Sequence, residues 1–136
     1  MDLHKAYSNL LDNTEWDYFV TFTSAYKLTS IEASSLMNRF KAAIKSRDVQ
    51  IFWVAERYKN KAGVHIHALI KVPNESNYIK KKGNSFYVEL WQKLSKKGSN
   101  YTTNRADVLR YNTSKSATYY ITKDILKDYT EYGFLY

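Results

Sequence analysis

The segment Gly63–Val72 alternates apolar side chains with others, and no other stretch restricts the fold of this chain as strongly. Its apolar members at every second position are Val64, Ile66, Ala68, Ile70 and Val72. Successive side chains of a β-strand point to opposite faces of a sheet, so this pattern predicts a strand with one buried face. His65 and His67 then share the other face, about 6 to 7 Å apart along the strand. Two neutral imidazoles placed in this way can bind one cation.

A carboxylate is expected beside these histidines. The apolar run Ile51–Tyr58 predicts a preceding strand, and Lys59–Gly63 has the length and glycine content of a hairpin connection. In an antiparallel pair, Glu56 near the end of the first strand would lie next to the histidines near the start of the second. The result would be a mixed ligand set of one carboxylate and two imidazoles. A His-x-His pair by itself is equally compatible with histidines that bind nothing.

The composition of this ligand set favours a catalytic over a structural metal site. Structural zinc sites are usually closed by four protein ligands, and the chain has no cysteine that could close this one. Three ligands leave coordination positions open for a substrate. One carboxylate with two imidazoles suits Mn²⁺ or Mg²⁺ acting on phosphate oxygens, with Zn²⁺ less favoured.

A second group of reactive side chains lies near the end of the chain. The segment Ser114–Lys127 has helical spacing of its apolar residues, which places Tyr120 and Lys123 on one face and Lys127 one turn further on. A phenol and an ammonium group on one face can approach the same phosphate. The alternative interpretation is that Tyr119 and Tyr120 are core aromatics and that Lys123 is a solvated surface charge.

With these residues the chain resembles the HUH endonucleases, in particular the single-tyrosine initiators of rolling-circle replication in plasmids and viruses. Three motifs of that family occur in order. They are an apolar strand at Phe19–Thr23, the His65-Ile66-His67 pair, and the YxxK motif Tyr120-Ile121-Thr122-Lys123. The resemblance extends from Trp16 to about Lys127.

The resemblance implies a metal-dependent nickase that acts on single-stranded DNA at a replication origin. His65 and His67 would bind a divalent metal, with Glu56 at the matching position for a third ligand. Tyr120 would attack the DNA, assisted by Lys123, to form a covalent 5′-phosphotyrosine and a free 3′-hydroxyl, and the same ester would allow strands to be rejoined. Adjacent helical tyrosines diverge by about 100°, so one nucleophile is expected. The YxxK spacing favours Tyr120 over Tyr119.

Three other interpretations share some of these features. A single-tyrosine HUH transposase would use the same chemistry, whereas relaxases usually bring three histidines. A two-histidine phosphoesterase would need a second separated motif. From a different class, a non-catalytic single-stranded nucleic-acid-binding protein could display His65 and His67 without using them.

The charge of the chain fits a nucleic-acid partner. Its net charge is +8 and its isoelectric point is about 9.5, and thirteen tyrosines could stack on unpaired bases. The basic residues expected to contact DNA are Lys80, Lys81, Lys82, Lys96, Lys97 and Lys127. No GxxxxGK[ST] phosphate loop is present, so unwinding would need a separate or host helicase. The chain could act as a monomer or a homodimer.

The order of expected elements predicts an α+β fold with a central antiparallel β-sheet and helices packed on one face. These elements are a strand at Asp17–Ser24, a helix at Ser30–Lys45 capped by Ser30, the hairpin Ile51–Val72, a helix at Ser85–Lys97, a strand at Ala106–Tyr111 and the tyrosine helix. Ile31 is expected on the inner face of the first helix. The stretch from Pro73 to Asn84 is expected to be a breaker and a lysine-rich loop. The family implies the same RRM-like, ferredoxin-like topology, with the histidine face open.

Length and hydropathy set the remaining expectations. A chain of 136 residues that is 44% hydrophobic suits one globular domain spanning residues 1–136. No apolar run approaches the roughly 20 residues that span a bilayer, and the N-terminus lacks a signal-peptide core. We therefore expect a protein without membrane contact in the cytoplasm of a host cell.

Overall fold

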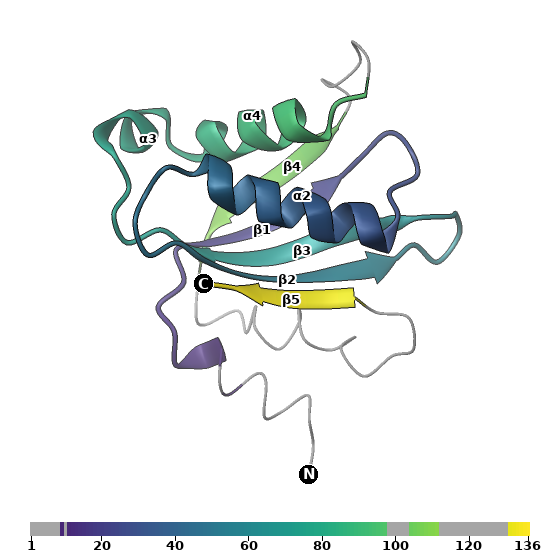
Figure 1. Cartoon of the computed structure of the whole chain (residues 1–136), viewed down its shortest axis with the longest axis horizontal. Coiled ribbons are helices and arrows are strands. Elements are labelled where there is room, and N and C mark those ends of the chain that lie inside the picture. The colour runs from purple at the N-terminus through teal and green to yellow at the C-terminus, as the bar shows by residue number, and fades with distance from the viewer. Residues whose placement is uncertain (1–8, 10, 98–103, 112–130) are drawn as a thin grey trace.

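The structure is a computed structural model that describes residues 9, 11–97, 104–111 and 131–136. A five-stranded antiparallel sheet forms its centre, with the strand order β4-β1-β3-β2-β5 (Figure 1). The strands are β1 (Tyr18–Thr23), β2 (Gln50–Arg57), β3 (Val64–Lys71), β4 (Arg105–Arg110) and β5 (Glu131–Leu135). Three helices pack against this sheet, which confirms the α+β class expected from the sequence.

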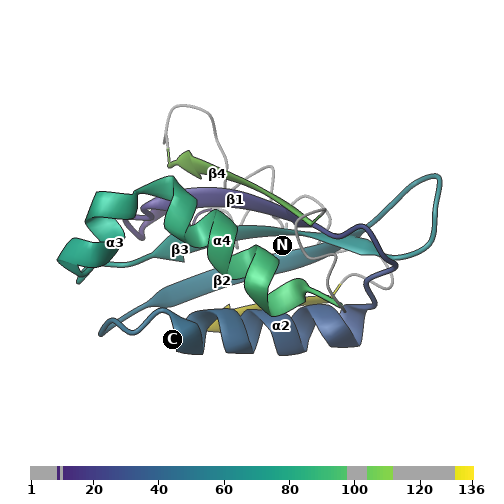
Figure 2. The same cartoon turned by 90° about the horizontal axis from the view of Figure 1, so that it is seen from above.

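The helices are α2 (Ser30–Ala43), α3 (Asn77–Lys82) and α4 (Asn84–Ser95). Figure 2 shows α2 and α4 running side by side over the same face of the sheet. Within the described ranges, no helix combines the length and the apolar character needed to cross a bilayer.

Two expectations for α2 are wrong. Its N-cap is Thr29, not Ser30, because the Thr29 side chain accepts from the backbone N–H of Glu32 while the Glu32 side chain accepts from the backbone N–H of Thr29. Ile31 is 84% exposed and does not belong to the inner face. The buried stripe of α2 is Ala33, Leu36, Met37 and Phe40. Ile31 lies two residues before this stripe begins, which turns its side chain away from the sheet.

The lysine-rich stretch is partly helical rather than a loop. Ser76 caps α3 by accepting from the backbone N–H of Ile79, and Ile79 is buried in the main core. Gly83 follows at a φ of 62°, where α3 ends and α4 begins. A serine cap and a glycine stop were visible in the sequence, but the lysines between them suggested a solvated loop.

The strand β5 was not expected from the sequence. It pairs with β2 so that Trp53 lies opposite Gly133 and Phe52 opposite Phe134. A Cβ atom at Gly133 would come within 2.7 Å of Trp53 Nε1, so this close approach requires glycine. A five-residue strand at a sheet edge depends on its partner more than on its own periodicity.

The sheet is buried on both faces for part of its area. The helix-facing core is formed mainly by Tyr18, Val20, Phe22, Ile66, Ile70, Phe40, Tyr87 and Trp91. A second apolar cluster on the other face contains Leu11, Trp16, Phe52, Val54 and Leu69. The expectation of an open opposite face is therefore wrong in part: β2 is apolar on both sides, as buried strands are, and its second side needs cover. The histidines lie on that same face, beside the second cluster.

Candidate metal centre

The register of β2 and β3 places Glu56 and the two histidines together. Glu56 lies opposite His65, and Val54 lies opposite His67. Side chains directly opposite each other in an antiparallel pair point to the same face. Val64 and Ile66, on either side of His65, belong to the helix-facing core, so His65, His67 and Glu56 point away from the helices.

The donor atoms of these three side chains converge. Glu56 Oε1 lies 3.5 Å from His65 Nε2, and Glu56 Oε2 lies 3.6 Å from His67 Nε2. The imidazole centroids are 4.7 Å apart with the rings nearly perpendicular, closer than their spacing along the strand suggests. One ligand atom from each residue lies within 4.8 Å of the others. Among the described residues, no other group of three such side chains meets this condition.

These separations fit a shared cation. Metal bonds to imidazole nitrogen and carboxylate oxygen are about 2.0 to 2.2 Å long, so two ligands of one ion stand up to roughly 4.2 Å apart. Both histidine–glutamate distances, 3.5 and 3.6 Å, lie within that limit. The donor set of two nitrogens and one carboxylate leaves coordination positions open. Glu56, His65 and His67 therefore form a candidate metal site.

Thr21 orients one of the two imidazoles. It lies directly opposite His67 in the β1–β3 pair, and its Oγ1 is 3.1 Å from His67 Nδ1. The hydroxyl oxygen can accept the Nδ1 proton, which is the tautomer that leaves the Nε2 lone pair facing Glu56. Sequence reasoning assigned Thr21 to the first motif strand but gave it no role. The pairing register that reveals it is not visible in the sequence.

Tyr58 packs against the other imidazole. Its ring centroid lies 4.7 Å from that of His65, and Lys61 Nζ lies 4.3 Å from the Tyr58 centroid. Burial raises the pKa of Tyr58, so the phenol is neutral at physiological pH. Sequence reasoning also missed Tyr58 as a neighbour of the site.

The side chains of the site are largely shielded from solvent. Those of Glu56, His65 and His67 are 23%, 16% and 7% exposed. Charges separated from bulk water interact more strongly, so a cation held here would act strongly on a phosphate oxygen that reached it. Glu56 and His65 retain the most exposure, which makes their side of the site the accessible one.

The residues expected to carry out nucleophilic attack lie outside the described residues. Tyr119, Tyr120, Lys123 and Lys127 all fall in the range 112–130, so their roles remain predictions. The described residues that flank this range, Tyr111 and Glu131, follow β4 and begin β5, the two outer strands of the sheet.

The structure does not bring the expected DNA-binding lysines to the candidate metal site. Lys80, Lys81 and Lys82 belong to α3, and Lys96 and Lys97 directly follow α4, in the helix layer on the other side of the sheet. Lys82 forms an ion pair with Glu89. Lys97 pairs with Glu32 at 3.1 Å and lies over the Tyr26 ring. Their contact with DNA stays a prediction.

An antiparallel sheet that carries a His-x-His pair beside a carboxylate, with helices on the opposite face, defines an HUH-type replication protein. The chain belongs to the ORF2 family of replication-associated proteins, whose family model matches residues 17–128. This confirms the resemblance drawn from the sequence, and the matched range agrees with the extent expected there. No curated protein and no solved structure matches the chain.

Proposed function

We propose that this protein nicks single-stranded DNA at a replication origin and joins the new 5′ end to a tyrosine. The observation that carries the proposal is the convergence of Glu56, His65 and His67 within 4.8 Å in a family of replication-associated proteins. The replication role of the family implies binding to origin DNA. A protein that starts replication by nicking needs such a site for one backbone phosphate.

The residues of the chain divide the chemistry between them. Glu56, His65 and His67 would hold a divalent cation, which when bound polarises the scissile phosphate and positions it for in-line attack. Thr21 would keep the His67 ring in the tautomer that presents Nε2. Both Mn²⁺ and Mg²⁺ suit the carboxylate and the phosphate, and Zn²⁺ suits the imidazoles alone.

Tyr120 is the proposed nucleophile and Lys123 its partner. The Tyr120 phenol oxygen would bond to phosphorus and lose its proton, the bond from phosphorus to the 3′ oxygen would break, and that oxygen would take up a proton. Tyrosine has an ordinary pKa near 10, so attack at neutral pH needs a nearby cation. Lys123 would supply it and stabilise the negative charge that develops on the phosphate oxygens.

Covalent labelling tests the proposal directly. The protein is incubated with a 3′- or internally labelled single-stranded oligonucleotide and Mn²⁺, and the adduct is located by mass spectrometry after digestion. We expect the label on Tyr120, loss of the adduct in Tyr120→Phe, and retention in the matched variant Tyr119→Phe. Attachment at Tyr119 would keep the function and move the nucleophile. Metal-independent binding without any adduct would select a non-catalytic single-strand binder instead.

A further inference from the structure

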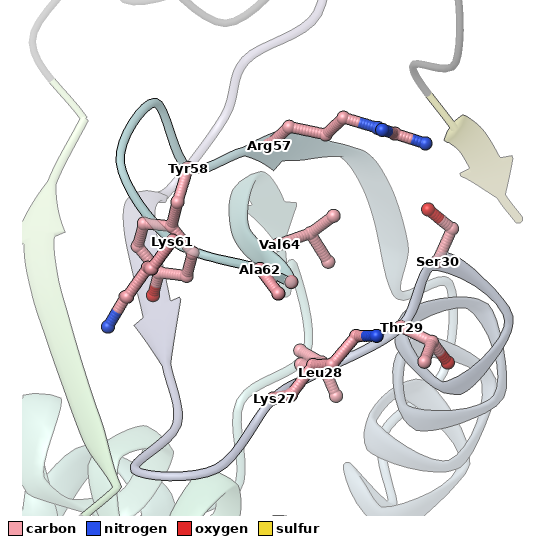
Figure 3. Close-up of a pocket in the computed structure, with 10 residues that line it drawn as sticks. Lys27, Leu28, Thr29, Ser30, Arg57, Tyr58, Lys61, Ala62 and Val64 are labelled. Carbon is pink, nitrogen blue, oxygen red and sulfur yellow. The ribbon is translucent and has the colours of Figure 1, made fainter.

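A second site adjoins the candidate metal site at the tip of the β2–β3 hairpin. A pocket of about 330 Å³ opens where the hairpin loop meets the connection between β1 and α2. Three cationic side chains from three separate segments line it: Lys27, Arg57 and Lys61. Figure 3 shows Arg57, Lys61 and Lys27 on different sides of the pocket, with Ala62 and Val64 between them.

The lining of this pocket is positive and contains no carboxylate. Glu56 precedes Arg57 in the chain, but its side chain lies with the histidines on the opposite face of the sheet. Glu32 is engaged in the cap of α2 and in its ion pair with Lys97. Several cations in one concave surface create a positive potential that attracts an anion.

The pocket is built on a rigid junction. The backbone N–H of Val64 donates to the carbonyl of Leu28 at 2.9 Å, which ties the hairpin to the β1–α2 connection. Gly63 has a φ of 97°, and a Cβ atom there would lie 3.1 Å from the backbone nitrogen of Leu28. The cations are therefore carried by segments whose relative positions are set by backbone contacts.

Tyr58 connects the pocket to the candidate metal site. It lines the pocket, and its ring packs at 4.7 Å from the ring of His65. Anything bound in the pocket is thus separated from the metal ligand His65 by one side chain. Apolar surface from Leu28, Ala62 and Val64 lies among the cations, which suits a ligand with both an anionic and a flat apolar part.

We propose that this pocket binds one nucleotide of the substrate strand next to the cleaved bond, a role that rests on the proposed nicking function. Its phosphate contacts Lys27, Lys61 and Arg57, and its sugar or base packs on the apolar surface. Contacts to backbone phosphates fix the register of a nucleic acid on a protein. The pocket therefore sets which phosphate reaches the metal site.

A charge-neutralisation scan tests this role independently of cleavage. Binding of a single-stranded oligonucleotide to the Tyr120→Phe protein is followed by fluorescence anisotropy at several salt concentrations. Lys27→Ala and Lys61→Ala are each compared with Lys45→Ala, which removes the same charge beyond the other end of α2. We expect Kd to rise about three- to tenfold in the pocket variants, and the slope of log K against log salt to fall by about 0.7. The Lys45→Ala control should change neither quantity.

Oligonucleotides with one methylphosphonate at a time identify the phosphate concerned. We expect one position adjacent to the scissile phosphate at which neutralisation weakens wild-type binding but leaves Lys61→Ala binding unchanged. Additive effects at every position would overturn the proposal, because they indicate only long-range attraction. Saturation of the pocket by a free mononucleotide at equal affinity would overturn it in favour of a nucleotide effector site. Coupling without any covalent adduct would keep the pocket and remove the nicking function.

Discussion

His67 Nδ1 lies 3.1 Å from the hydroxyl oxygen of Thr21, its direct cross-strand neighbour in the β1–β3 pair. The opposite nitrogen of the same ring faces Glu56 Oε2 at 3.6 Å. One imidazole is thus held between a hydroxyl on one strand and a carboxylate on another. Three adjacent strands of the sheet contribute to the geometry of this ring.

Removal of the Thr21 hydroxyl should weaken metal binding. Thr21→Val keeps the β-branched shape but leaves His67 Nδ1 without this partner, and loss of an outer-shell partner typically costs about 10- to 100-fold in metal affinity. Isothermal titration with Mn²⁺ measures the effect. Thr21→Ser should retain most of the affinity, and Thr23→Val, two residues along β1, serves as the matched control. Equal affinities for Thr21→Val and the wild type would show that the hydroxyl does not orient the ring.

Loss of the Glu56 charge should have a larger effect than loss of the Thr21 hydroxyl. Glu56→Gln preserves size but replaces the carboxylate that faces both histidines with a neutral amide, so we expect affinity for Mn²⁺ to fall by more than about 100-fold. In the wild type, affinity should also fall as the pH is lowered, because protons compete with the metal for imidazole and carboxylate. Titrations between acidic and neutral pH test both expectations. An affinity in Glu56→Gln close to that of the wild type would exclude Glu56 as a ligand.

The protein should lose stability at alkaline pH through a buried tyrosine pair. Tyr18 and Tyr87 both donate to Glu75 Oε2, at 2.5 and 2.6 Å. Burial, then the hydrogen bond to Glu75, raises the pKa of Tyr18 to about 12 from its ordinary 10.0. The pKa of Tyr87 is raised for the same reasons.

The sign of this pH effect follows from proton binding. Between pH 10 and 12 the folded state holds a proton on Tyr18 that the unfolded chain has released, so the free energy of unfolding falls as the pH rises through this window. Below pH 10 the contribution is complete. Urea unfolding at several alkaline pH values measures the decline, and Tyr18→Phe should reduce its slope. An unchanged slope in Tyr18→Phe would assign the effect to other groups.

A side chain at Gly133 should weaken the docking of β5. Its Cβ would lie 2.7 Å from Trp53 Nε1 and 3.0 Å from Trp53 Cε2, and Trp53 is buried in the main core. We expect Gly133→Ala to lower the free energy of unfolding by about 1 to 3 kcal/mol, the usual cost of overpacking a core. Chemical denaturation measures it, with Glu131→Ala at the exposed start of the same strand as the control. A loss no greater than that of Glu131→Ala would show that Trp53 can move aside.

The sequence by itself determined the local features of this protein. The alternation across Gly63–Val72 placed His65 and His67 on one face, and the hairpin brought Glu56 to them, because side-chain direction along a strand follows from backbone geometry alone. The ordered motifs also identified the family. These conclusions needed only neighbouring residues and one short connection.

The tertiary structure decided which distant residues meet. The pairing of Thr21 with His67, the docking of β5 on β2 and the cationic pocket at Lys27 and Lys61 each join segments that are far apart in the chain or lie on separate turns. Register between such segments is set by packing of whole faces, and a shift of one residue would move every side chain to the other face. Local periodicity carries no information about that choice, so only the assembled sheet reveals it.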